Sequence, residues 1–182
     1  MPRIPSVTRD QLTPDDRHYF DRIAESRGSV RGPYSVLMHS PKLAGLVSDL
    51  GEYLRFGTEI PKDLTEVVTL ATAREIGSRY EFYAHAPLAR KAGVSEQTFL
   101  AIAHGSAPED LSGDEEMVVR YTQELLRDRK ISDTTFDVVQ NRFGVQGMVD
   151  LTALVGHYLL VGHVMAAFDV EPPPGEPPEF PV

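Results

Sequence analysis

The sequence predicts an all-α fold, a bundle of about eight helices in one domain, and three observations carry this prediction. Apolar residues recur at helical spacing between the chain ends, without the alternating β-branched runs that mark strands. A chain of 182 residues with 41% apolar residues is long enough to bury one core. Prolines are frequent at both ends, which predicts an N-terminal arm over 1–13, a helical domain over 14–170 and a proline-rich tail over 171–182.

The first three predicted helices share a pattern of start and stop residues. Each has a proline near its start, where the missing N–H leaves no helical hydrogen bond unmade. Each ends at a glycine, which adopts the left-handed backbone that terminates helices. These helices cover 13–28, 40–57 and 60–77.

Five further helices are predicted over the rest of the domain. The segments 78–93 and 95–105 each start at a serine and end at a glycine. The segment 113–130 has acidic residues in its first turn and basic residues in its last, as the helix dipole favours. A helix over 132–144 then leads into the most apolar one, over 145–170.

Part of that last helix has the composition of a short membrane span. Residues 151–168 carry no formal charge at neutral pH, and eighteen residues reach the lower bound for crossing a bilayer. The stretch contains two histidines and two glycines, however, and no lysine or arginine anchors either end. A helix that is apolar all round is also typical of a core or a subunit interface, so we predict a buried helix and no membrane partner.

Composition excludes several classes of function. Acidic residues outnumber basic ones by 27 to 18 and the basic residues do not cluster, so we predict no nucleic-acid partner. The absence of cysteine excludes disulfides, thiolate metal sites and thiol redox chemistry. The first seventeen residues lack the apolar run of a signal peptide, and we predict a cytoplasmic protein.

The segment "GSRYEFYAHAPLA", residues 77–89, places three polar side chains on one face of a helix start. At about 100° per residue, Ser78, Glu81 and His85 fall within about 60° of one another. Two interpretations fit this pattern. Ser-x-x-Glu after a glycine is typical of a capping box, in which Ser78 and Glu81 each bond the other's backbone N–H. Glu81 and His85, four residues apart, are also spaced for a proton relay.

The stretch "AREIGSRYEFYAHAPLARKAGVSEQTFLAI" resembles the carboxymuconolactone decarboxylase-like proteins. The redox-active branch of that family, the alkylhydroperoxidase D group, has a Glu, eleven residues, a Cys, two residues, a second Cys, three residues and a His. In this chain the same spacing falls on Glu66, Ser78, Glu81 and His85, so both cysteines are replaced. Because the peroxidase chemistry of that branch needs two thiols, this chain is expected to lack it.

The resemblance implies an AhpD-like helical fold, a homo-oligomer that is commonly a trimer or hexamer, and a pocket lined by residues 66–85 near a subunit interface. It also implies an enzyme acting on a small unsaturated lactone or oxo-acid, for which we predict no cofactor. Glu66 becomes a pocket residue only through the resemblance. By helical periodicity it lies about 200° from the apolar stripe at Leu64, on a side shared with Lys62 that is expected to be solvated.

A decarboxylase of this kind needs a proton donor and a group that stabilises an oxyanion. We expect His85 to donate the proton, and Glu81 to stay ionised at the helix N-terminus and orient His85. The remaining candidates are polar side chains for contacting the substrate: Ser78 and Tyr80 at the oxyanion, Arg74 at a carboxylate, and His157 on the pocket wall.

Two alternatives remain open at the level of sequence. The loss of both cysteines also fits a non-catalytic oligomeric protein whose pocket binds a small apolar ligand. Glu66, Glu81 and His85 are also possible metal ligands, but the Glu-to-His step of four differs from the i, i+3 step of di-iron bundles, and we predict no metal.

Overall fold

The computed structural model describes residues 2–111 and 113–173, and every regular element within those two ranges is helical. This confirms the predicted fold class. The α-helices are α1 (Arg17–Arg27), α2 (Pro33–Leu37), α3 (Pro41–Phe56), α4 (Lys62–Glu75), α5 (Arg79–Ala92), α6 (Glu96–His104), α7 (Gly113–Gln123) and α8 (Asp133–Ala167). Three shorter turns are η1 (Arg9–Gln11), η2 (Pro108–Asp110) and η3 (Glu124–Asp128). The predicted proline-rich tail lies outside the described residues from 174 onward.

Helix ends follow the start and stop residues of the sequence. Gly28, Gly93 and Gly105 follow α1, α5 and α6 with φ of 76°, 103° and 68°, the left-handed backbone that ends a helix. The Ser95 side chain accepts a hydrogen bond from the backbone N–H of Thr98 and so caps α6. These ends fix the length of α5 and the turn between α5 and α6.

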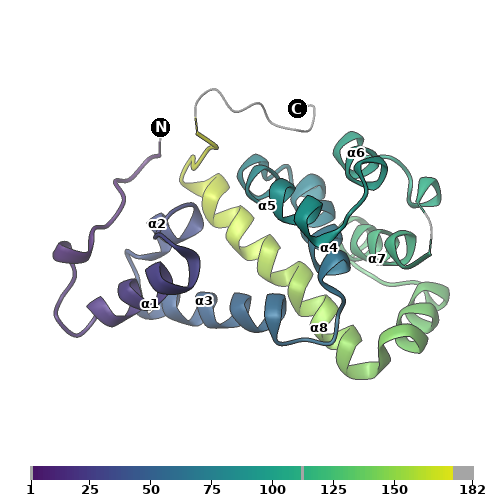
Figure 1. Cartoon of the computed structure of the whole chain (residues 1–182), viewed down its shortest axis with the longest axis horizontal. Coiled ribbons are helices and arrows are strands. Elements are labelled where there is room, and N and C mark those ends of the chain that lie inside the picture. Colours follow the sequence, from purple (N-terminus) through teal and green to yellow (C-terminus); the bar gives the residue numbers. More distant parts are fainter. Residues whose placement is uncertain (1, 112, 174–182) are drawn as a thin grey trace.

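α8 is interrupted where the sequence predicts a boundary between two helices, over 132–144 and 145–170. The element runs from Asp133 to Ala167, but Gly144 has a non-helical backbone (φ 67°, ψ −179°), so two helical parts meet there at a kink. The longer part of α8 crosses the middle of the molecule, with α1 to α3 on one side and α4 to α7 on the other (Figure 1). α8 can therefore supply side chains to both halves.

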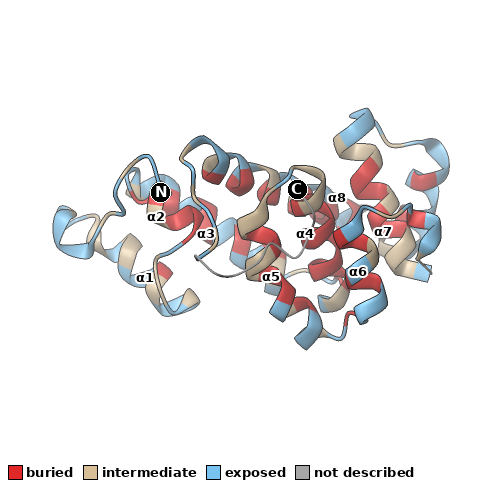
Figure 2. Cartoon of the chain, turned by 90° about the horizontal axis from the view of Figure 1, so that it is seen from above, coloured by how far each residue is buried: buried red, intermediate tan, exposed pale blue. Residues whose placement is uncertain are grey.

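α4 is buried on every side, which the sequence did not predict. Each residue from Leu64 to Ala73 is buried, and α4 is red along most of its length in Figure 2. The helices α5, α7 and α8 pack around it. The expectation of a solvated Glu66 is therefore wrong, because neighbouring helices also cover the side of α4 away from Leu64.

By length and composition alone, α8 is long and apolar enough to cross a membrane. In its most apolar window, 56% of the residues are buried within the protein. The core helix of a globular fold passes the same test, and the burial of α8 between the two halves matches that case.

Candidate active site

The centre of the candidate site is a hydrogen bond between α4 and α5. The His85 Nδ1–H donates to Glu66 Oε2 at 2.7 Å, and both side chains are buried. A carboxylate can only accept a hydrogen bond, so this contact fixes the proton of a neutral His85 ring on Nδ1. The other ring nitrogen, Nε2, is left to act as an acceptor.

Two side chains approach Nε2 from different helices. Glu81, one turn earlier on α5, places Oε2 at 3.5 Å, and Tyr158 of α8 places its hydroxyl at 3.3 Å. The Tyr158 ring also packs edge-on against His85, with ring centroids 5.0 Å apart. His85 thus lies between two carboxylates, one on each edge of its ring.

Burial changes the acidity of the groups around His85. The pKa of Glu81 is raised, chiefly because burial penalises its charged form, and this outweighs the opposing attraction of His85, Arg55 and Arg27. Burial likewise raises the pKa of Tyr158, so its hydroxyl keeps its proton at neutral pH. Burial therefore acts against the ionised Glu81 that the sequence suggests, and its effect on the pKa exceeds that of the neighbouring positive charges.

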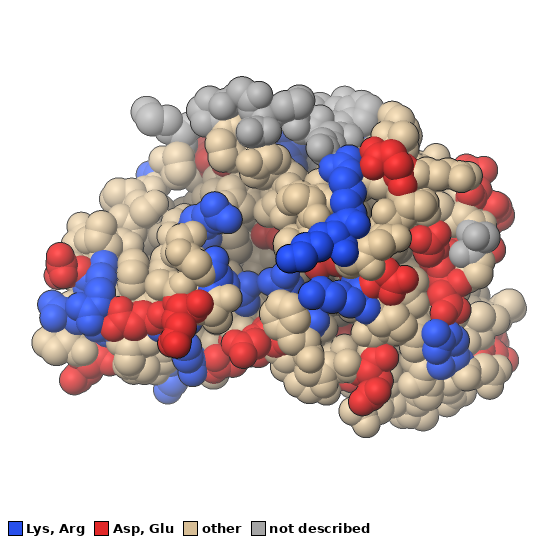
Figure 3. Space-filling model, viewed as in Figure 1, with Lys and Arg blue, Asp and Glu red and all other residues tan. Residues whose placement is uncertain are grey.

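Glu81 and His85 line a cleft of about 440 Å³ between the ends of α1 and α3, α2, and α5. Three arginines line the same cleft, namely Arg27, Arg31 and Arg55. Figure 3 shows basic side chains gathered in the middle of the face that it displays, although the chain is acidic as a whole. The cleft therefore combines cations with a buried carboxyl group whose pKa is raised.

Two of these arginines are held only loosely by the protein. Arg55 Nη2 lies 4.0 Å from Glu66 Oε1, and the buried Arg55 Nε has no hydrogen-bond partner. Arg27 stacks over the ring of Tyr34, 4.5 Å from its centroid, and its bonds to Ser48 are long, at 3.4 and 3.5 Å. Both guanidinium groups retain donors for a ligand.

The predicted capping box is not formed, and Ser78 does not join the site. Ser78 precedes α5, but its side chain makes no capping hydrogen bond. It lines a different hollow of about 110 Å³, against the end of α8, near Gly162. Of the residues proposed for an oxyanion, only Tyr80 lines the His85 cleft.

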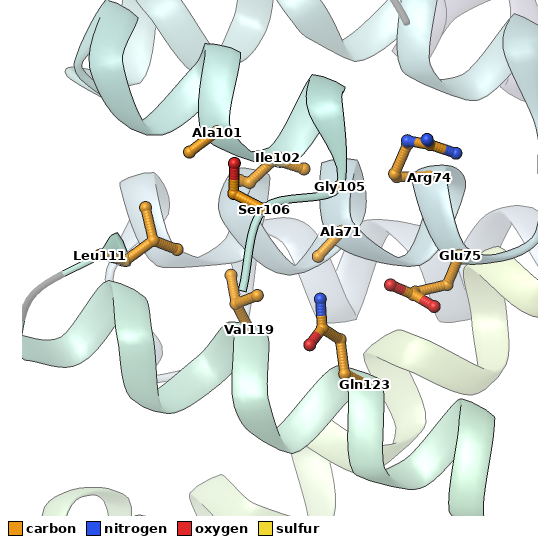
Figure 4. A pocket seen from close by; sticks show the side chains of 10 residues that line it. All are labelled: Ala71, Arg74, Glu75, Ala101, Ile102, Gly105, Ser106, Leu111, Val119 and Gln123. Carbon is orange, nitrogen blue, oxygen red and sulfur yellow. The ribbon is translucent and has the colours of Figure 1, made fainter. Parts of the chain in front are cut away.

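Arg74 also lies away from the cleft. It lines a small cavity of about 10 Å³ between the end of α4, α6 and α7, and its Nε donates to the carbonyl of Ala103 at 3.0 Å. Figure 4 shows this cavity, with Arg74 and Glu75 from α4 on one side and Gln123 from α7 below them. The space is at most enough for one water molecule, so Arg74 is placed to hold α6 against α4 rather than to bind a substrate there.

His157 is buried beside the site and is not among the cleft-lining residues. Its ring packs where Gly51 leaves room, because a Cβ at residue 51 would lie 2.7 Å from His157 Nε2. Burial, with the nearby charge of Arg27, lowers the pKa of His157 to about 4, so its ring is neutral. The next residue, Tyr158, makes the contact with His85.

The arrangement also bears on the metal alternative. His85 directs its two nitrogens to Glu66 and Glu81 on opposite edges of the ring, so the three side chains do not converge on one point. Within residues 2–111 and 113–173, no group of three His, Cys, Asp or Glu side chains is placed to hold a metal ion.

Five charged or titratable residues of the cleft or site were missed from the sequence. They come from four different helices and one connection: Arg27, Arg31, Tyr34, Arg55 and Tyr158. No local spacing connects them with residues 66–85. The one available signal was position 158 beside His157, in a helix predicted to be buried.

Comparison with known proteins gives a family match and solved structures of similar fold. The model of the carboxymuconolactone decarboxylase family matches residues 41–132, half of the chain, which includes Glu66, Glu81 and His85. Among curated proteins, none matches the sequence.

Solved structures with this fold share little sequence with the chain. The AhpD core of an uncharacterized peroxidase-related protein from Ralstonia eutropha JMP134 has a TM-score of 0.79 at 15% identity, over 95% of this chain and 93% of that one. A peroxidase-related protein from Silicibacter sp. TM1040 gives 0.73 at 15% identity, over 95% and 94%. A Cys-to-Ala variant of the debrominase Bmp8 in complex with 2,3,4-tribromopyrrole gives 0.72 at 14%, over 92% and 90%. These likenesses show the AhpD-like fold, and with the family match they establish that the chain belongs to the carboxymuconolactone decarboxylase family.

Proposed function

We propose that this protein is a cofactor-independent enzyme that decarboxylates a small unsaturated lactone or oxo-acid by proton transfer. The observation that carries the proposal is the buried Glu66–His85–Glu81 arrangement at the wall of an arginine-lined cleft. A buried carboxyl group with a raised pKa, next to a histidine held in one tautomer, is typical of sites that move protons.

The proposed reaction needs no external oxidant or reductant. The bond between the substrate carbon and its carboxylate breaks, CO2 leaves, and the electron pair passes into a conjugated carbonyl to give an enolate. A proton from the site then bonds to carbon as the carbonyl reforms. The site recovers its proton from water, so the net change is replacement of a carboxylate by hydrogen, with uptake of one proton.

The two glutamates have different parts in the proposed reaction. Glu66 holds His85 from behind, through the 2.7 Å bond to Nδ1. Glu81 lies on the Nε2 edge and lines the cleft, where its raised pKa suits a proton donor. His85 then connects the two carboxylates and returns a proton to Glu81 after each turnover. The orienting role that the sequence suggested for Glu81 is thus given to Glu66, and the proton-donor role suggested for His85 is given to Glu81.

The cleft offers groups for the charges of such a substrate. Arg55 and Arg27 have donors for a carboxylate or for the enolate oxygen. Burial raises the pKa of Tyr34 and Tyr80, so both phenols stay protonated and can donate to an oxyanion. The debrominase of the same fold is solved with a small brominated ring compound, which supports a small unsaturated ring as the ligand here.

The test is a set of unsaturated lactones and oxo-acids that carry a carboxylate, incubated in D2O. We expect release of CO2 and incorporation of one deuterium at the carbon that lost it. His85→Gln should reduce both signals by about a hundredfold or more. Arg22→Gln, which changes an arginine on α1 outside the cleft, should retain them. Binding of these compounds without CO2 release would favour the non-catalytic, ligand-binding alternative.

We also propose that a second copy of the chain covers an apolar surface on α3 and α8, as part of the expected trimer or hexamer. Leu43, Leu46 and Leu50 form an exposed stripe along α3, and Val145 and Val149 are exposed on α8. Exposed apolar side chains at helical spacing are typical of an interface. Light scattering should give a multiple of the 20.2 kDa chain mass.

Charge placed in this stripe tests the assembly. Leu46→Glu with Leu50→Glu should give the single-chain mass. Leu100→Glu, at a leucine on α6 that is about as exposed as Leu50, should leave the assembly intact. A wild-type mass of one chain would refute this proposal.

A further inference from the structure

We propose that binding of a carboxylate ligand by Arg27 and Arg55 loads a proton onto Glu81, so that the charge of the substrate prepares its own proton donor. The inference rests on the proposed function for the kind of ligand, but it concerns binding and requires no turnover. It follows from the presence of both parts in one cleft: the arginines that would bind the ligand, and Glu81, the proton donor.

The receptor for the carboxylate is identified by unused hydrogen-bonding capacity. Arg55 Nε is buried and has no partner. Arg55 Nη2 lies 4.0 Å from Glu66 Oε1, which is too long for a hydrogen bond, so the guanidinium that lines the cleft keeps donors for a ligand. Arg27 and Arg31 line the same cleft and add positive charge. A buried guanidinium N–H without an acceptor costs free energy, and a carboxylate supplies the planar acceptor that fits it.

The surroundings of Glu81 come from six helices or their connections. From α5 itself come His85, at 3.5 Å, and the Tyr80 phenol. The other charged or titratable groups around it are Arg27 at the end of α1, Arg31 before α2, Tyr34 of α2, Arg55 of α3, Glu66 of α4 and Tyr158 of α8. Among these, His85, Arg55 and Arg27 favour the ionised form of Glu81, while burial and Glu66 oppose it.

A bound carboxylate changes this balance in one direction. Its negative charge neutralises the two arginines that favour ionised Glu81, and it also displaces water from the cleft. Both effects favour the protonated form of Glu81. The neighbouring His85, held on its other side by Glu66, provides the path along which a proton can reach Glu81. The ligand and the proton therefore bind together, and each strengthens the binding of the other.

Calorimetric titration with benzoate tests the inference, because benzoate is ionised at pH 7 and benzamide is a neutral ligand of nearly the same shape. Titrations at one ionic strength in phosphate and in Tris, whose ionisation enthalpies differ, give the number of protons taken up per ligand bound. We expect the wild-type protein to take up roughly half a proton or more with benzoate and none with benzamide.

Variants separate the receptor from the proton site. Arg55→Gln should weaken benzoate binding at least about tenfold, as expected for a lost charged contact. The control Arg22→Gln, which removes an arginine paired with Asp49 outside the cleft, should not. Glu81→Gln should still bind benzoate, and more tightly, but with less than about a third of the wild-type proton uptake. The matched control Glu75→Gln, on α4 and paired with Arg127, should keep the full uptake.

Four results would overturn the inference. They are absence of benzoate binding up to millimolar concentration, binding without proton uptake, equal uptake with benzamide, and unchanged uptake in Glu81→Gln. Failure of the proposed function gives a different pattern, since proton-linked binding of benzoate would persist although no lactone or oxo-acid loses CO2.

Discussion

The two ends of α4 carry similar side chains into very different surroundings. Near its start, Glu66 bonds His85, whose other edge faces a cleft of about 440 Å³. In its last turn, Arg74 bonds the carbonyl of Ala103, and Glu75 pairs with Arg127 at 2.7 Å, around a cavity of about 10 Å³. Both ends contain partly or fully buried charges with partners.

The two ends of α4 differ in whether polar groups are left without hydrogen-bond partners next to free space. At the last turn, the polar groups named above bond protein atoms and no room is left for a ligand. At the start, Arg55 Nε has no partner, the pKa of the buried Glu81 is raised, and the cleft is open. Paired charges therefore identify structural contacts as readily as sites, whereas unused donors beside free volume identify the site.

Among the variants that test this comparison, His85→Gln should cause the largest loss of kcat. Loss of the ring that connects Glu66 with Glu81 should lower kcat about 10²- to 10⁴-fold, the usual contribution of a proton-transfer group. Arg74→Gln at the other end should leave kcat within about twofold and instead lower the free energy of unfolding by about 1 kcal/mol. Steady-state kinetics and urea unfolding measure the two effects. Equal kcat losses in both variants would remove the functional distinction between the ends of α4.

Glu81→Gln should separate activity from stability. We expect kcat to fall about a hundredfold. The double variant with His85→Gln should be little worse than the worse single variant, since both residues belong to one relay.

The effect of Glu81 on stability depends on pH. A carboxyl group whose folded-state pKa is raised binds more protons in the folded than in the unfolded protein. Its ionisation therefore destabilises the fold as pH rises from the unfolded pKa through the folded one.

Glu81→Gln removes that ionisation. The variant should be more stable than wild type at pH 7 to 8, by about 1.4 kcal/mol for each unit by which folding raises the pKa, and equal to it near pH 4. Thermal unfolding between pH 4 and 8 checks this. A variant that is less stable at pH 8 would show that Glu81 is held ionised, contrary to the effect of its burial.

Glu66→Gln and Glu75→Gln form a matched pair on the same helix. In Glu66→Gln, the amide oxygen can still accept a hydrogen bond from His85 Nδ1, but the side chain carries no charge to stabilise a protonated ring. We therefore expect kcat to fall about tenfold to a hundredfold. Glu75→Gln breaks a surface pair with the half-exposed Arg127, which is worth about 1 kcal/mol or less, and should not change kcat. A larger kcat loss in the Glu75 variant would reverse the assignment.

His157 gives the smallest expected effect on activity and a distinct dependence on pH. Its pKa of about 4 in the folded protein is below the unfolded value of 6.5, so the folded state binds fewer protons between these values. The wild type should lose up to about 3 kcal/mol relative to His157→Leu as pH falls from 6.5 to 4. We expect kcat near neutral pH to stay within a few-fold. Parallel stability curves for the two proteins would contradict a buried neutral His157.

Local signals were sufficient for most of the fold and for only part of the site. Gly28, Gly93 and Gly105 end helices because the left-handed backbone is a property of the residue itself. The burial of Glu66 could not be read from its own helix, since it depends on α5 and α8 covering a side that periodicity alone leaves to solvent. The spacing of the family pattern placed Glu66, Glu81 and His85 together, but not the direction in which each carboxylate points.

The remaining site residues could not be predicted from the sequence, because they are distant from residues 66–85 along the chain. Arg27 and Arg55 lie in α1 and α3, and Tyr158 lies 73 residues after His85 on α8, so only the packing of the whole chain brings them together. Ser78 shows the opposite error. Its position before a helix and its spacing from Glu81 fit a capping box, yet Glu81 contacts His85 instead.

The close fit of Gly51 against His157 has an evolutionary consequence. Any side chain at position 51 would collide with the imidazole, with a Cβ only 2.7 Å from Nε2. Changes at the two positions are then coupled: alanine or serine at position 51 requires the imidazole to move or a smaller residue to replace His157. Sequence alignments of close homologues should therefore show correlated substitutions at these two positions, separated by 106 residues in the chain.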